Sequence, residues 1–433
     1  MTRYFKKEES ENCGWKLVVK VIQLIEYYKP MDKGVKMKIL CVNAGSSSLK
    51  FQLYEMPEEV SIISGYVEKI GADDSFYTVK YDGEKVEKQA KIKNHADAVK
   101  IMLDELVSYG AVEDLTEIKG VGHRVLHGGE KYADSVVIND KVVADIKELT
   151  KLGPLHHPGN LAGIKAMQKA LPEATQVAVF DTAFHHTIPK TQYMYPVPME
   201  WYTKYGVRKY GFHGTSHKYI TQTMQQKLGK TDVNLIICHV GSGASITAVK
   251  NSESYDTTMG LTPLDGLMMG TRSGSIDPSI IKYVIDESGM TYDEVDDTLN
   301  KKSGLLGICG FNDNRDVEKA IAEGDKDAKL ALDMYVDRID RYIAEYYLEL
   351  GGKVDAIVFT AGVLENGATT RAEIIEGLAP LGIKINHEVN EAIASFKEIT
   401  SGIITAEDST VPVYVEPTNE EVMITRDAYK FCS

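Results

Sequence analysis

Residues 39–55, ILCVNAGSSSLKFQLYE, place one glycine and three consecutive serines between two apolar runs. The stretch is not a P-loop, because Gly45 reaches Lys50 without a second glycine and the residues that follow alternate as in a strand. It predicts a strand, a turn and a second strand. The backbone N–H groups, serine hydroxyls and lysine of such a turn suit phosphate oxygens. An ordinary polar hairpin is the alternative interpretation.

Residues 235–250, LIICHVGSGASITAVK, repeat this design about half a chain later. His239 takes the place of Asn43, and glycine and serine residues again precede a second apolar run. The β-branched residues after Gly243 argue against the helix of a dinucleotide-binding motif. Two similar hairpins predict a duplicated fold in which each copy contributes one loop to a shared cleft.

Residues 356–367, AIVFTAGVLENG, predict a buried strand that ends in a glycine turn. The helix before this strand is expected to stop at the pair Gly351 and Gly352, as helix C-termini often do. Its apolar face would consist of Tyr335, Ile339, Tyr342, Tyr346 and Leu350. Helix and strand therefore alternate, which indicates the α/β class.

The composition of the 433 residues, 43% hydrophobic and 26% charged, indicates a soluble chain with two or three folded domains. A formal charge of −14 disfavours a nucleic-acid or anionic-membrane surface, so anionic substrates would need local positive groups. The five cysteines are scattered, and we therefore expect reduced thiols and a cytoplasmic protein.

Residues 1–36 differ from the rest of the chain. Their apolar segment at residues 16–28 is interrupted by Lys20, Gln23 and Glu26, so it is neither a membrane span nor a signal-peptide core. We interpret residues 1–36 as an N-terminal extension outside the catalytic core, produced by a start codon read too early. A membrane-surface or partner-binding helix is the alternative.

Eight of the eleven histidines lie between His123 and His217. The HGTSH segment lacks the glutamate of HExxH, which disfavours a zinc site, and the absence of GxSxG disfavours a serine hydrolase. Arg124 and Arg272 stand in the glycine-flanked segments GHRVLHGG and MGTRSGS. Arginine suits carboxylate and phosphoryl oxygens, and a structural salt bridge is the alternative for each residue.

Seven motifs, in this order, resemble those of the acetate kinase family over residues 37–433: VNAGSSSLKF, GHRVLHGG, FDTAFH, YGFHGTSH, MGTRSG, FTAG and EPTNEE. The resemblance implies a duplicated actin-like (ribonuclease H-like) α/β fold of two domains with a nucleotide cleft between them. The N-terminal domain would be residues 37–181, rejoined by a C-terminal helix at residues 421–433. The nucleotide-binding C-terminal domain would be residues 182–420.

The resemblance also implies a reaction: reversible, Mg²⁺-dependent phosphoryl transfer from ATP to acetate, giving acetyl phosphate and ADP, with Mn²⁺ as an alternative metal. It implies a homodimer that binds neither nucleic acid nor membrane. The implied metal positions are Asn43 and Glu420. The implied catalytic positions are Arg124, which would orient the carboxylate, His156, Asp181, His213 and Arg272. Asp181 would hold a metal-bound water or orient an arginine.

Two further groups of positions follow from the resemblance. The acyl pocket would be formed by Leu126, Leu155, Phe212 and Pro263, beside Arg124. The nucleotide would be held by Ser46, Ser48, Lys50, His239, Val240, Gly241, Ser242, Gly243, Asp313, Asn314, Arg315, Gly362, Val363, Leu364, Glu365 and Asn366.

Three positions depart from the family pattern. Ser242 stands in HVGSG where the family usually has HLGNG, Ser275 ends GTRSGS where the family has GTRSGD, and Leu364 stands in GVLEN where the family has GIGEN. If Leu364 points into the adenosine pocket, purine affinity falls. The alternative functions are a propionate or other short-chain acyl kinase and a pyrophosphate-dependent acetate kinase. A non-catalytic nucleotide-dependent clamp, resembling actin or a chaperone, is a further alternative. It would not explain why Arg124, Asp181, His213 and Arg272 occur together.

Overall fold

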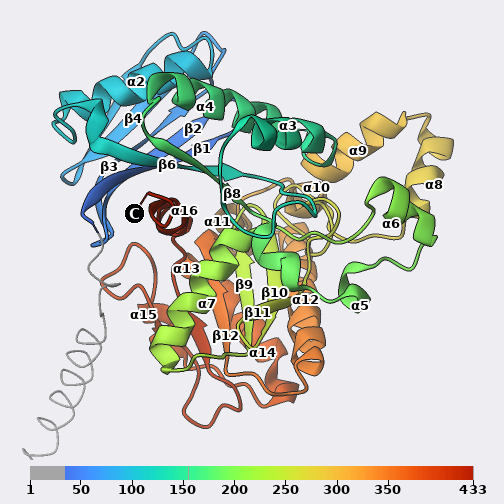
Figure 1. The fold of residues 1–433 in the computed structure, drawn as a ribbon. Helices are drawn as coiled ribbons and strands as arrows, with labels where there is room; N and C mark the ends of the chain where they lie inside the picture. Colours follow the sequence, from blue (N-terminus) through green and yellow to red (C-terminus); the bar gives the residue numbers. More distant parts are fainter. Residues whose placement is uncertain (1–34, 155, 433) are drawn as a thin grey trace, which may run out of the picture.

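The computed structural model describes residues 35–154 and 156–432, and the chain forms two β-sheets with helices on their faces (Figure 1). The first sheet has the strand order β5-β4-β3-β2-β1-β6-β8-β7. Its strands are β1 (Met37–Ala44), β2 (Leu49–Met56), β3 (Val60–Glu68), β4 (Phe76–Tyr81), β5 (Glu84–Gln89), β6 (Ile118–Val125), β7 (Val136–Val137) and β8 (Thr175–Phe180).

The second sheet has the order β11-β10-β9-β12-β14-β13. Its strands are β9 (Leu235–Val240), β10 (Ala244–Lys250), β11 (Glu253–Thr257), β12 (Ala356–Thr360), β13 (Gly402–Ile403) and β14 (Val413–Val415). In each sheet an antiparallel hairpin, β1-β2 or β9-β10, is joined by two parallel strands, β6 and β8 or β12 and β14. Both predicted hairpins and the duplicated α/β topology are therefore confirmed.

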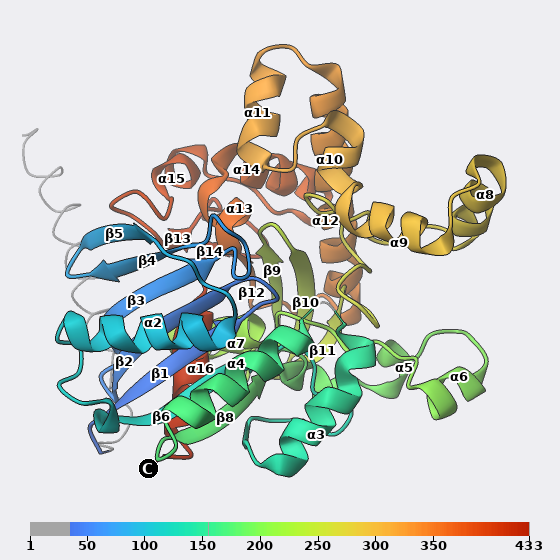
Figure 2. The same cartoon turned by 90° about the horizontal axis from the view of Figure 1, so that it is seen from above.

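Three helices cover the two faces of the first sheet (Figures 1 and 2). They are α2 (His95–Ser108), α4 (His157–Ala170) and α16 (Glu420–Tyr429). Met102 of α2 packs in one apolar cluster with Leu40, whereas Ile424 of α16 packs in another with Ile39. Because Ile39 and Leu40 are consecutive in β1, their side chains face opposite sides of the sheet. The end of the chain thus returns to the sheet that its beginning forms.

The second sheet lies between other helices. They include α7 (Gly214–Leu228), α12 (Lys326–Glu349) and α14 (Ala368–Gly377). Ile220 of α7 packs in a cluster with Ile237, and Ile339 of α12 packs in a different cluster with Ile236, so α7 and α12 cover opposite faces. The predicted apolar face of α12 is confirmed, and this helix ends at Glu349, just before the two glycines.

The glycine turn predicted after β12 is wrong, because helix α13 (Ala361–Asn366) begins there directly. Ala361 takes a left-handed φ of 67°, and its N–H donates to Glu365 Oε1 at 2.7 Å. At the other end, Arg371 Nη1 donates to the carbonyls of Leu364 and Glu365 at 2.9 and 3.0 Å. These contacts satisfy the backbone groups at both ends of a short helix, and local sequence does not reveal them.

The remaining helices lie around the two sheets. They are α3 (Asp140–Glu148), α5 (Lys190–Tyr193), α6 (Met199–Tyr205), α8 (Ser279–Ser288), α9 (Tyr292–Lys301), α10 (Gly304–Cys309), α11 (Asn314–Ala322) and α15 (His387–Ala392). Helices α8 and α9 extend away from the body of the molecule (Figure 2). Among the described residues, no helix is both long enough and apolar enough to cross a membrane. Residues 1–36, which we interpret as an extension outside the catalytic core, lie almost wholly outside the described residues.

Candidate active site

The β1-β2 turn is held in place by helix α4. The N–H of Gly45 donates to the carbonyl of Ser48 at 2.9 Å, which closes the turn. Asn160 Nδ2 of α4 donates to the Ala44 carbonyl at 2.7 Å, and a Cβ on Gly159 would lie only 2.3 Å from the Gly45 oxygen. The helix can approach the turn this closely only with glycine at position 159. Sequence reasoning missed Gly159 and Asn160, although the PGN segment holds both.

Arg124 and Asp181 lie side by side at the ends of the parallel strands β6 and β8. Arg124 donates from Nε to Asp181 Oδ1 at 3.1 Å and from Nη2 to Oδ2, which makes a two-pronged ion pair. Its Nη1 also lies 3.4 Å from Asn43 Oδ1. Burial raises the pKa of Asp181, and the Arg124 guanidinium opposes that shift. Asp181 therefore orients Arg124, which still borders an open cavity.

That cavity has a volume of about 410 Å³ and contains both predicted metal positions. Asn43, Lys50, Arg124 and Glu420 all line it. Burial raises the pKa of Glu420 to about 7, Arg124 opposes the shift, and Asp181 adds to it. No ion pair reaches Glu420 within the described part of the chain. Carboxylate and amide oxygens are ligands that Mg²⁺ prefers, so Asn43 and Glu420 fit a divalent cation.

His213 and Arg272 converge on one point beside the second hairpin. A Cβ on Gly243 would lie 3.5 Å from both His213 Nε2 and Arg272 Nη1. His213 has a left-handed φ of 56°, an uncommon conformation for a residue with a side chain, and it immediately precedes α7. Arg272 Nη1 donates to the Pro263 carbonyl at 3.3 Å, and in the described chain it pairs with no carboxylate. Arg272 is thus available to an anion.

His156 lies near both arginines. Burial and, to a smaller extent, the charges of Arg124 and Arg272 together lower its pKa to about 4. The ring is therefore neutral at physiological pH. It immediately precedes α4, the helix that also holds the β1-β2 turn.

The predicted acyl-pocket residues are mostly apolar and buried. Leu126 and Phe212 belong to one apolar cluster. The rings of His127 and Phe212 pack edge to face, with their centroids 5.6 Å apart. Pro263 contributes its carbonyl to Arg272. Leu155 lies outside the described residues.

A second cavity, of about 610 Å³, is lined by half of the predicted nucleotide positions. Those that line it are Gly241, Ser242, Asp313, Asn314, Arg315, Gly362, Val363 and Asn366. The other half do not line it: Ser46, Ser48, Lys50, His239, Val240, Gly243, Leu364 and Glu365. Lys50 lines the first cavity instead. Sequence reasoning missed Gly270, Leu305, Asn312, Glu318, Tyr335, Gly367, Ser395 and Phe396, which also line it. Most of these come from segments without a recognisable motif.

Leu364 does not point into this cavity. Its side chain is fully buried in the apolar cluster between α12 and the second sheet. Glu365 is likewise engaged, because it accepts the backbone N–H groups of Ala361 and Thr418 at 2.7 and 3.2 Å. The condition under which Leu364 would lower purine affinity, a side chain that points into the cavity, is therefore not met.

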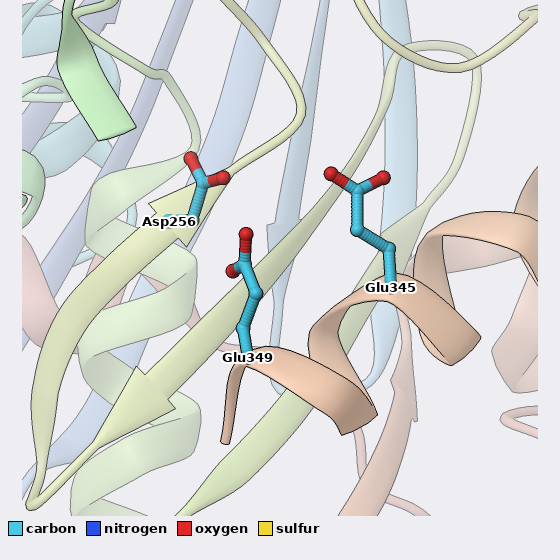
Figure 3. Close-up of side chains that lie close together, drawn as sticks. All are labelled: Asp256, Glu345 and Glu349. Atoms are coloured by element: carbon cyan, nitrogen blue, oxygen red, sulfur yellow. The ribbon is translucent and has the colours of Figure 1, made fainter. Parts of the chain in front are cut away.

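Three carboxylates gather elsewhere, between β11 and the end of α12 (Figure 3). They are Asp256, Glu345 and Glu349. Lys209 pairs with Asp256, and Gln192 donates to Glu349 Oε1 at 3.1 Å. Burial raises the pKa of Glu349 to about 7, and the charges of Asp256 and Glu345 add to this shift. None of the three lines either cavity described above.

Comparison with known proteins identifies the family of this chain. Residues 38–426 match the model of the acetokinase family. The chain belongs to the acetokinase family. The acetate kinase of Geobacillus sp. (strain WCH70) is 52% identical over 399 residues, which cover 92% of this chain and 99% of that protein. The acetate kinase of Geobacillus kaustophilus is 50% identical over the same length.

Solved structures of this family superpose closely. The Porphyromonas gingivalis acetate kinase gives a TM-score of 0.87 at 41% identity, covering 92% of this chain and all of that one. A propionate kinase from Francisella tularensis gives 0.86 at 42% identity, covering 91% and 99%. This acetokinase-family chain therefore has the actin-like fold and is a kinase that transfers phosphate to a carboxylate acceptor. The family implies ATP as substrate and a divalent metal.

Proposed function

We propose that this enzyme transfers the terminal phosphoryl group of ATP to acetate, reversibly and with Mg²⁺, Mn²⁺ being the alternative metal. The observation that carries the proposal is the convergence of His213 Nε2 and Arg272 Nη1 on one point above Gly243. Arg124 and Arg272 both lie near enough to His213 for their charges to lower its pKa. Two cationic groups and a neutral N–H donor suit a carboxylate that meets a phosphoryl group.

The chemistry needs positioning and charge rather than a base, because acetate is already ionised at neutral pH. In the proposal Arg124 binds the acetate carboxylate, and Arg272 and His213 face the oxygens of the phosphoryl group in transfer. Asp181 holds Arg124 and takes no proton. A divalent cation at Asn43 and Glu420 would supply further positive charge at the phosphate oxygens.

Acetate is the proposed acceptor, although the family includes a protein named propionate kinase. In the proposal, Leu126 and Phe212, which belong to one apolar cluster, form the acyl pocket beside Arg124 and admit little beyond a methyl group. Each further methylene should cost roughly 1–3 kcal/mol in specificity. Hydroxylamine trapping of acyl phosphate with acetate, propionate and butyrate measures this. A kcat/KM for propionate equal to that for acetate would contradict the assignment.

ATP is the proposed donor rather than pyrophosphate. A cavity of about 610 Å³ beside the second hairpin is large enough for a nucleoside, and pyrophosphate would not need it. The side chain of Leu364 does not narrow this cavity. A panel of ATP, GTP and pyrophosphate at saturating acetate tests the donor, and faster turnover with pyrophosphate than with ATP would overturn the proposal.

The domain division at residues 37–181 with 421–433, and 182–420, is part of the proposal. Each part contains one sheet, and α16 packs on the first. We place the active site between them, because Arg124 belongs to one part and Arg272 to the other.

We further propose a cytoplasmic homodimer that binds neither nucleic acid nor membrane. Exposed aromatic residues on helices that project to one side of the molecule support a second copy as the partner (Figures 1 and 2). They are Trp201 and Tyr205 of α6, Tyr283 of α8 and Tyr292 of α9. Sedimentation velocity of the wild type and of Tyr283→Glu tests this, and a monomeric wild type would contradict it.

A further inference from the structure

A buried serine lies between two histidines behind the proposed phosphoryl site. Ser245 Oγ is 2.9 Å from His213 Nδ1 and 2.9 Å from His217 Nε2. Ser245 and His217 are fully buried, whereas His213 is only partly buried. A serine hydroxyl has one hydrogen to donate, so at least one of the two histidines must donate to the serine. If both donated, the buried serine hydrogen would have no acceptor among the described contacts.

The other nitrogen of His217 decides the direction of these bonds. His217 Nδ1 is buried and has no hydrogen-bond partner. If Ser245 donated to His217 Nε2, the neutral ring would carry its proton on Nδ1, as a buried N–H without an acceptor. Such orphaned donors are rarer than unpaired acceptors. The favoured chain therefore runs from His217 Nε2–H to Ser245 Oγ, and from Ser245 O–H to His213 Nδ1.

This direction determines what His213 presents to the cleft. The pKa of His213 lies well below its ordinary value because of burial, and nearby His239, His217, Arg124 and Arg272 add to the shift. The ring is therefore neutral and has one N–H. With Nδ1 accepting from Ser245, that N–H is on Nε2, the atom that converges with Arg272 Nη1.

We propose that Ser245 and His217 are positioning residues that fix His213 as the Nε2–H tautomer, so that it donates to the phosphoryl group in transfer. The inference rests on the role of His213 in the proposed function. Without Ser245, the two nearby arginines would favour the opposite tautomer, with the Nε2 lone pair facing their positive charge. That tautomer would repel a phosphoryl oxygen.

The test compares Ser245→Ala with Thr247→Val. Thr247 is a matched control, since it is buried on the same strand and, among the described residues, its hydroxyl bonds only to the Thr257 hydroxyl, at 2.9 Å. Ser245→Ala should lower kcat by roughly ten-fold or more and leave the KM values for acetate and ATP within about two-fold. Thr247→Val should keep wild-type kcat. Equal kcat values in the two variants would overturn the proposal.

A double-mutant cycle and a spectrum separate positioning from general damage. In a His213→Ala background, adding Ser245→Ala should lower kcat no further, because the serine acts through the histidine. A second, independent drop would overturn the proposal. ¹⁵N NMR of histidine-labelled protein, with His213 assigned from its alanine variant, should show Nε2 protonated in the wild type. A proton on Nδ1 of His213 would overturn this proposal, whatever the activity of the enzyme. A wild type that made no acetyl phosphate would instead refute the proposed function, because the spectrum reports the tautomer without turnover.

Discussion

Arg124 and Asp181 show how far single residues could be predicted. The residue type and glycine-flanked setting of Arg124 indicated an anion site, and the structure places Arg124 at a cavity. The role of Asp181 followed only from the family resemblance. Their pairing could not be predicted from local sequence, because 57 positions separate them and only the parallel strands β6 and β8 bring them together. The Ser245 link to His213 and His217 was missed for the same reason.

Arg124→Ala should therefore affect both binding and stability. Loss of the guanidinium should raise the acetate KM, and it leaves Asp181 buried without its cation, at a cost of about 3 kcal/mol in unfolding free energy. The double variant Arg124→Ala/Asp181→Asn should regain much of the stability and none of the acetate affinity. Denaturant unfolding and acetate titration measure the two effects. An Arg124→Ala protein as stable as the wild type would contradict the role of the pair.

Leu364→Ala should destabilise the protein without changing donor binding. Removal of this fully buried side chain should cost about 2–5 kcal/mol, because it leaves a cavity in the core. Val363→Ala is the matched control, since Val363 lines the nucleotide cavity, and it should change the ATP KM instead. Thermal unfolding and ATP titration of both variants provide the comparison. A Leu364→Ala variant with altered ATP KM and unchanged stability would show that the residue faces the nucleotide.

At the scale of elements, long periodic patterns predicted the strands and helices correctly, whereas short segments did not. Both hairpins and helix α12 were predicted because their apolar residues alternate or recur over many positions. Helix α13 was missed because six residues hold too little periodicity, and Arg371, which caps its C-terminus, carries no recognisable capping motif. The nucleotide cavity was incomplete in the prediction because Ser395 and Phe396 come from a loop without a motif.

The end of α12 should make stability depend on pH through Glu349. Its folded-state pKa is about 7, above the value of about 4.3 in an unfolded chain, so stability should fall as pH rises between these values. Glu349→Gln should remove this pH-dependent loss of stability. The Tm of the variant minus that of the wild type should therefore be roughly 1–3 °C larger at pH 8 than at pH 5. Glu323→Gln, on the exposed end of α11, is the control and should show the same Tm difference at both pH values. An equal Tm difference for Glu349→Gln at both values would contradict the prediction.

At the scale of the whole molecule, the duplicated topology was predicted because two hairpins with the same design stand about half a chain apart. The outer strands β4, β5, β11 and β13 and the projecting helices α8 and α9 were not predicted, because no repeated motif marks them. The return of α16 to the first sheet was implied only by the family resemblance, since no local pattern specifies which sheet a terminal helix covers.

Removal of residues 1–36 should leave activity and stability nearly unchanged. The first strand begins at Met37, and the family match begins at residue 38. The described contacts that would be lost are the Tyr429 hydroxyl bond to the Val35 carbonyl and the exposed pair of Lys36 with Glu55. Tm should fall by no more than about 2 °C. An insoluble or inactive truncated protein would show that this segment packs on the enzyme.

The most direct test of phosphoryl transfer at this site is hydroxylamine trapping of acetyl phosphate by the wild type and Arg272→Ala side by side. With ATP, Mg²⁺ and acetate, the wild type should form the hydroxamate. Arg272→Ala should lose roughly 100-fold in kcat with little change in acetate KM, because Arg272 acts on the phosphoryl group in transfer. No product above a heat-inactivated control, or equal turnover by both proteins, would contradict the proposed site.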